Sequence, residues 1–169
     1  MAFKPKHILV AVAVGAGDEN AAAEALVDSA VDLAIPLGAR LTLLYASVPS
    51  GPAMPVDPAL AGTAYDAMLA VLEANRSHAR RALDALKDRA VKHGVTVDVQ
   101  MLEPVAGVGE LVADTAKALG ADLLMLCSHG RRGLKRVLLG SVADRVAHLS
   151  PVPVLIFHTP PATPGGGAA

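Results

Sequence analysis

Apolar and polar positions along the chain follow two alternating periods. Short runs rich in Val, Ile and Leu are separated by longer stretches whose apolar residues recur every three or four positions. The short runs are typical of strands and the long stretches of helices. The predicted strands span residues 7–14, 40–47, 95–102, 122–127 and 152–158. The predicted helices span residues 19–37, 63–93, 109–119 and 141–149.

Strands that alternate with helices predict an α/β fold with right-handed crossovers. We therefore expect a five-stranded parallel sheet in a Rossmann-like three-layer α/β/α sandwich, formed by one domain over residues 1–158. Residues 48–58 hold four prolines and predict a loop. Residues 159–169 contain mainly Pro, Gly and Ala, which predicts a disordered tail. In such sheets ligands bind beyond the carboxyl ends of the strands.

Composition narrows the function classes. Hydrophobic residues make up 53% of the chain and aromatic residues only 2%, so the core must consist mainly of Ala, Val and Leu. The net charge is −1, without the basic excess or the stacking aromatic residues of a nucleic-acid binder. Cys127 is the sole cysteine, which excludes an internal disulfide and a cysteine zinc site.

The first residues allow two interpretations. Lys4 and Lys6 precede the apolar run 8–14, which could be a short signal peptide. We favour the strand, because the run is at the short limit for a signal peptide and the fold needs it. No apolar run reaches transmembrane length. We therefore expect a cytoplasmic protein without a membrane partner.

The loop after the fourth strand carries the clearest chemical signal. Gly130 and Gly133 allow the backbone to approach a ligand, and Gly140–Ser141 opens a helix. The free amides and the positive dipole end of that helix favour an anion such as phosphate. Ser141 is predicted to cap the helix, with Asp144 completing a capping box. The alternative is that the glycines only turn the chain and Ser141 only caps the helix.

The spacing of this loop resembles the signature of the universal stress protein family. Nine residues separate Gly130 from Gly140–Ser141, and a helix and the turn 150–154 into the last strand follow. The resemblance extends from Lys6 to His158. It implies a stress-response protein that binds ATP, with Mg²⁺ as a companion ion, and that regulates its partners rather than catalysing a reaction.

The resemblance also implies a set of nucleotide-binding residues. They are Ala11, Val12, Ala13, Cys127, His129, Gly130, Arg131, Gly133, Gly140, Ser141 and Val142. Two of these positions depart from the family pattern: Cys127 replaces a glycine, and Ala13 replaces an aspartate that contacts the nucleotide in ATP-binding members. The alternative hypothesis is a dimeric interaction module that has lost nucleotide binding.

Other chemistries have weaker support. Gly15 and Gly17 match two-thirds of a dinucleotide fingerprint, but the acidic residue expected at the end of the second strand is absent. The six histidines show no metal-ligand spacing. We see no nucleophile paired with a general base, so we expect no enzyme, with slow ATP hydrolysis left open.

The last strand is expected at the edge of the sheet, where Pro153 is tolerated. An apolar edge invites pairing with another chain. The family resemblance implies a homodimer formed through this strand, from Val152 to Phe157. The alternative is that the tail folds back over it.

Overall fold

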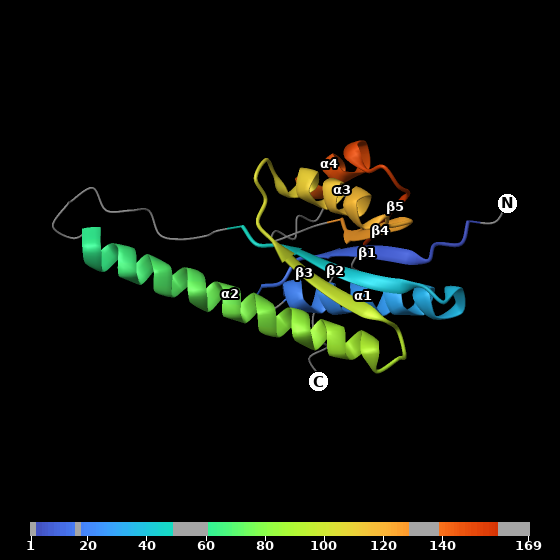
Figure 1. Cartoon of the computed structure of the whole chain (residues 1–169), viewed down its shortest axis with the longest axis horizontal. Coiled ribbons are helices and arrows are strands. Elements are labelled where there is room, and N and C mark those ends of the chain that lie inside the picture. The colour runs from blue at the N-terminus through green and yellow to red at the C-terminus, as the bar shows by residue number, and fades with distance from the viewer. Residues whose placement is uncertain (1–2, 16–17, 49–60, 129–138, 159–169) are drawn as a thin grey trace, which may run out of the picture.

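The computed structural model describes residues 3–15, 18–48, 61–128 and 139–158. Four helices and five strands alternate along this part of the chain, in the predicted order (Figure 1). The strands are β1 (His7–Val12), β2 (Arg40–Ala46), β3 (Val97–Leu102), β4 (Leu123–Cys127) and β5 (Val154–Phe157). The helices are α1 (Asp18–Leu37), α2 (Ala61–Val91), α3 (Val108–Leu119) and α4 (Ser141–Leu149).

The five strands form one parallel sheet in the order β3-β2-β1-β4-β5. β1 lies at its centre, with Ile8 level with Leu41 of β2 on one side and with Leu123 of β4 on the other. β2 and β3 are added on one side of β1, and β4 and β5 on the other. The strand order therefore reverses between β1 and β4. This confirms the predicted α/β class, the parallel sheet and the place of β5 at an edge.

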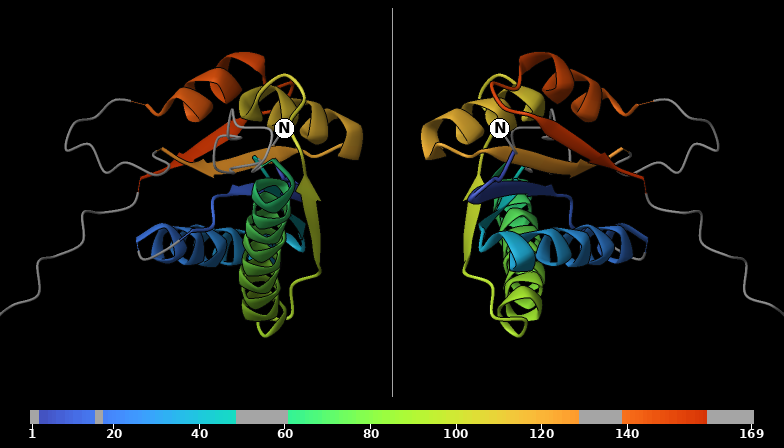
Figure 2. Two further views of the ribbon diagram at one scale, coloured as in Figure 1. Left: turned by 90° about the vertical axis from the view of Figure 1, so that its left-hand side faces the viewer. Right: turned by 90° about the vertical axis from the view of Figure 1, so that its right-hand side faces the viewer.

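Helices cover both faces of the sheet, which gives the predicted three layers (Figure 2). α1 and α2 lie on one face, where Leu26 and Leu83 are fully buried against Val10 of β1 and its neighbours. α3 and α4 lie on the other face, where Val112 and Val146 enclose a second apolar cluster. β1, β2, β4 and β5 contribute alternate residues to the two clusters, as expected for a sheet covered on both faces, whereas edge strand β3 contributes only to the cluster under α1 and α2.

Three strand boundaries differ from the prediction by two residues and three others by one, because backbone pairing rather than apolar character ends a strand. β1 ends at Val12 rather than at residue 14, although Val14 is still buried. β3 begins at Val97 rather than at residue 95. β5 begins at Val154 rather than at residue 152, directly after Pro153, whose carbonyl accepts a hydrogen bond from the Leu124 amide at 3.0 Å.

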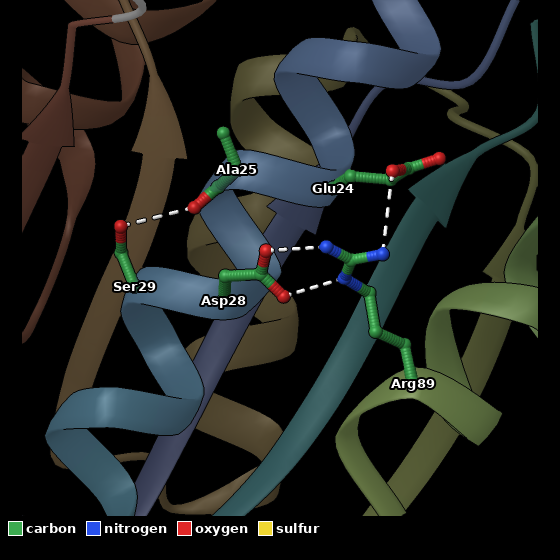
Figure 3. Close-up of polar contacts among 5 residues, drawn as sticks. All are labelled: Glu24, Ala25, Asp28, Ser29 and Arg89. Carbon is green, nitrogen blue, oxygen red and sulfur yellow. Dashed lines mark hydrogen bonds and ion pairs between the residues drawn. The ribbon is translucent and has the colours of Figure 1, made fainter. Parts of the chain in front are cut away.

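Arg89 of α2 joins the two helices on its face of the sheet (Figure 3). Its Nε and Nη2 donate to the two carboxylate oxygens of Asp28 on α1, at 2.5 and 2.7 Å. Its Nη1 lies 3.4 Å from a carboxylate oxygen of Glu24. The Arg89 pair lowers the pKa of Asp28, so this carboxylate remains charged well into the acid range.

The first half of α2 projects past the carboxyl edge of the sheet (Figure 1). Ala79, Leu83, Leu86 and Ala90 in the second half are buried against the sheet. From residue 62 to residue 78 no side chain whose burial is described is buried. Within the described residues, no helix is both long and apolar enough to cross a bilayer. The predicted loop 48–58 (from residue 49) and the predicted tail 159–169 lie outside the described residues.

Candidate functional site

The carboxyl ends of β1 and β4 mark the point where the strand order reverses, which is where open α/β sheets bind ligands. The start of α4 is held at this point by backbone hydrogen bonds. The Gly140 amide donates to the Ser128 carbonyl at 2.8 Å, and the Ser128 amide donates to the Phe157 carbonyl at 2.9 Å. Because Ser128 follows β4 directly and Phe157 ends β5, the N-terminus of α4 is fixed relative to both strands.

The N-terminus of α4 carries no side-chain cap within the described residues. Gly140, in an extended conformation, occupies the N-cap position, and Ser141 is the first helical residue. The predicted capping role of Ser141 and the capping box with Asp144 are therefore wrong. The reason is that the helix begins at Ser141 itself, one residue earlier than a Ser141 cap requires. The Asp144 amide donates to the Gly140 carbonyl at 2.8 Å. This backbone hydrogen bond closes the first turn of the helix without the side chain of Ser141 or of Asp144.

This geometry leaves the first amides of α4 available to an anion. The first N–H groups of any helix have no acceptor within the helix, and among the described residues no capping side chain replaces one. Ser141 and Val142 are exposed beside them. Gly140 has no Cβ to block a ligand that approaches these amides. Partial positive charge at a helix N-terminus favours negative ligands.

The end of β1 presents three of the predicted contact residues in different ways. Ala11 is half-buried, Val12 is 6% exposed and packs into the core, and Ala13 is exposed. Of the three side chains, only that of Ala13 is fully accessible at this edge of the sheet. It ends in a methyl group, so β1 contributes no charged side chain there.

Cys127 ends β4 with its side chain turned toward α1. Its Sγ lies 3.7 Å from the Ala22 carbonyl, and the residue packs against the core cluster under α1 and α2. Burial raises the pKa of this thiol to about 11. Cys127 therefore stays protonated near neutral pH and is not an activated nucleophile. The predicted residues His129, Gly130, Arg131 and Gly133 lie outside the described residues.

A hollow beside β1 and β2 contains residues that the sequence did not indicate. It has a volume of about 160 Å³ and is lined by Tyr45 at the end of β2 and by Asn75, Arg76 and His78 of α2. His78 Nε2 lies 3.3 Å from the Gly15 carbonyl, and the Gly15 amide donates to Asn20 Oδ1 at 3.2 Å. The one signal in the sequence was Asn75, which interrupts the apolar face of the helix 63–93.

A larger hollow lies elsewhere, between α1 and α2, with a volume of about 740 Å³. Arg89 crosses it to reach Asp28 and Glu24 (Figure 3). Its lining residues come from α1, from α2 and from the two residues after α2, and none comes from a strand. We therefore place the candidate site at the strand ends and regard this groove as the seam between two helices. The described residues contain no group of three His, Cys, Asp or Glu side chains placed to hold a metal ion.

Comparison with known proteins covers most of the chain. A family model, described as the universal stress protein family, matches residues 4–158. Universal stress protein YxiE of Bacillus subtilis is 31% identical over 153 residues, which cover 87% of this chain and 96% of the relative. Universal stress protein MJ0531 of Methanocaldococcus jannaschii is 37% identical over 90 residues, 53% of this chain and 52% of the relative. The chain thus spans about half the length of this relative and of Sll1388 of Synechocystis.

Solved structures agree with these relatives. Universal stress protein UspA from Lactobacillus plantarum superposes with a TM-score of 0.69 at 25% identity, covering 90% of this chain and 97% of UspA. A universal stress protein in complex with cAMP superposes at 0.59 and 24% identity, covering 93% and 99%. The dAMP complex of the Archaeoglobus fulgidus protein superposes at 0.59 and 17%, covering 88% and 94%. This chain belongs to the universal stress protein family.

Proposed function

We propose that this protein binds an adenine nucleotide, ATP in the first instance, at the carboxyl edge of its sheet and acts in stress response through binding rather than fast catalysis. The observation that carries the proposal is the uncapped N-terminus of α4, held at the switch point by the hydrogen bond from the Gly140 amide to the Ser128 carbonyl. A phosphate there would accept hydrogen bonds from the amides of α4.

The hollow beside β1 and β2 offers contacts for the part of such a ligand that lies away from the phosphates. Tyr45 offers an apolar ring with a polar tip, and Asn75, Arg76 and His78 offer hydrogen-bonding groups. The hollow and α4 lie on the two sides of β1, along the same edge of the sheet. Two proteins of the same fold bind adenine nucleotides, cAMP in one case and dAMP in the other.

The direct test is to denature the purified protein, assay the supernatant for adenine nucleotide, and titrate the nucleotide-free protein with ATP by calorimetry. We expect bound nucleotide or measurable heat. Gly140→Val should abolish binding, because its side chain would stand before the α4 amides. Gly62→Val is the control: it makes the same change in the first turn of α2, where an added Cβ meets no atom within 4 Å, and should leave affinity unchanged. Absence of nucleotide and of heat up to millimolar ATP would refute the proposal.

A second candidate function is a universal stress protein that works without nucleotide as an interaction module. The exposed methyl group of Ala13 favours it, because no side-chain carboxylate or amide meets the ligand at the end of β1. Ala13→Asp separates the two candidates. If the phosphate site is intact, the restored polar contact should strengthen ATP binding by about 1–3 kcal/mol, or roughly 5- to 150-fold. An interaction module without a phosphate site would not gain affinity.

A further inference from the structure

The part of α2 that projects beyond the sheet, residues 62–75, is here called the arm. α2 has 31 residues and is therefore about 46 Å long at a rise of 1.5 Å per residue. Its second half packs on the sheet, whereas the arm extends beyond the strand ends (Figure 1). In the end-on views of Figure 2, α2 lies along a single axis beneath the sheet. The arm thus continues a core helix into a region where the sheet has ended.

The side chains of the arm are those of a buried helix. Tyr65, Leu69 and Val71 are 49%, 45% and 41% exposed, and Met68 and Leu72 are half-exposed. Asp66 and Glu73 are the two charged residues of the arm, whereas Arg76, Arg80 and Arg81 follow within six positions. A helix that is apolar around most of its surface is normally covered by other protein. A stretch of about 15 residues is also marginal as an isolated helix in water.

The apolar face of the arm is in phase with the face that packs on the sheet. Tyr65 is 18 residues before Leu83, Met68 is 18 before Leu86, and Leu72 is 18 before Ala90. Eighteen residues make five turns of an α-helix, so each pair lies on the same side of α2. Leu83, Leu86 and Ala90 are at most 5% exposed in the core. The arm therefore presents a core-type face that has no sheet to pack on.

We propose that the arm is a self-association surface, which pairs antiparallel with the arm of a second copy of this chain. The arm is self-complementary about a two-fold axis between Ala70 and Val71. In that register Leu69 lies level with Leu72 of the second copy. Tyr65 lies level with its Arg76, a pairing that places a guanidinium on an aromatic face.

Charge supports the same arrangement. The arm carries only acidic charges, and the segment that follows it, residues 76–81, carries three arginines and no acid. In the register given above, Asp66 lies level with Asn75 of the second copy, one position from its Arg76, and the two helix dipoles are opposed. About 14 residues per copy are fewer than the roughly 20–30 of a standard interface. We therefore expect association that depends on protein concentration.

Sedimentation velocity over a range of concentrations tests this surface. The double variant Tyr65→Glu with Leu69→Glu should lose association through the arm, because it places two carboxylates on the face where the arms of the two copies meet. Ala70→Glu with Ala74→Glu is the matched control, since it makes the same charge change on the exposed outer side of the same helix. The control should associate as the wild type does. A wild type that stays monomeric, or a Tyr65→Glu with Leu69→Glu variant that associates unchanged, would overturn the proposal.

Crosslinking separates this surface from any association through β5. In a Cys127→Ala background, Leu69→Cys should give covalent dimers with a short bismaleimide reagent, whereas Ala74→Cys should not. Circular dichroism confirms that each variant is folded. If Leu69→Cys remains monomeric, the arm covers another part of this chain or binds a different protein, and self-association is wrong. The readout needs no nucleotide. Because Leu72, Asn75 and Arg76 belong both to this surface and to the hollow proposed for the nucleotide, both assays are run on nucleotide-free protein.

Discussion

His7 is a buried histidine whose neighbours determine its protonation state. His7 is 5% exposed. Its Nδ1 lies 3.1 Å from Arg40 Nη2, and its Nε2 lies 2.8 Å from Thr42 Oγ1. Because a guanidinium only donates, Nδ1 accepts and Nε2 carries the proton. Burial and then the charge of Arg40 lower the pKa of His7 below 6.5, against the opposing carboxylates of Asp122 and Asp98.

The lowered pKa predicts acid sensitivity. As the pH falls below 6.5, His7 takes up a proton in the unfolded chain before it does so in the folded protein. The free energy of unfolding should therefore decrease from pH 6.5 down to the lowered pKa, and this contribution should be fully present above pH 6.5. Urea denaturation between pH 5 and 8 measures it. His7→Gln should flatten the profile, whereas the same change at the exposed His158 should not.

Cys127 leads to a prediction about reactivity. Burial raises the pKa of its thiol from 9.0 to about 11, so near neutral pH the thiolate fraction is about 100-fold lower than for a free cysteine. Alkylation at pH 8 should be slower by at least that factor in the folded protein than in urea. Mass spectrometry of iodoacetamide-treated samples gives both rates. Comparable rates would show that the thiol is accessible and would contradict its burial.

At the scale of elements, α3 and α4 pack unusually closely at Gly109. A Cβ added to Gly109 would lie 2.6 Å from Cγ and 2.8 Å from Cβ of Arg145 on α4, atoms near the backbone that cannot swing away freely. Arg145 Nε also donates to Glu110 Oε1 at 2.7 Å, which holds the arginine in place. We expect Gly109→Ala to destabilise the fold by about 1–3 kcal/mol through overpacking.

Gly62 provides a matched control, because it too is the second residue of its helix. No atom lies within 4 Å of a Cβ added there. Gly62→Ala should therefore be neutral or stabilising by up to about 1 kcal/mol, since alanine is the better helix former. Thermal unfolding of both variants measures the difference. Equal effects would mean that the α3–α4 contact tolerates a methyl group.

The helices and strands could be predicted from the sequence because the spacing of apolar residues along the chain differs between the two. All nine were predicted, because runs such as residues 123–127 and the apolar stripe of α1 follow period and length alone. Their ends depend on hydrogen bonds that period does not encode. Val14 is apolar and buried yet outside β1, and Ser141 is a good capping residue that the helix start leaves at its first helical position.

For the whole molecule, β5 remains a predicted homodimer interface. The carbonyls of Pro153 and Phe157 accept hydrogen bonds from Leu124 and from Ser128, which follows β4, so Val154 and Ile156 direct their amides to the outer edge. Ile156→Pro removes one of these amides and should reduce the association measured by light scattering. Ile156→Val keeps the amide and should associate as the wild type does. Unchanged association of the proline variant would place the dimer interface elsewhere.

The candidate site was only partly predictable, because it combines residues that the fold brings together. The α4 start could be recognised from the local spacing of Gly140 and Ser141. Tyr45, His78 and Arg76 could not be assigned, because nothing in the sequence shows that α2 crosses the ends of β1 and β2. The contact between His78 and the Gly15 carbonyl joins residues 63 positions apart.

The central position of β1 has a consequence for synthesis of the chain. β1 is made before the other four strands, but its pairing with β4 joins segments that are far apart: Ile8 lies level with Leu123, 115 positions later. During translation β1 can pair with β2 early, while its other edge stays open until residues 123–127 have been made. Long-range pairing of this kind is slow and exposes aggregation-prone edges. The nascent chain should therefore depend on chaperones until β4 has left the ribosome, and fragments that end before residue 123 should be insoluble.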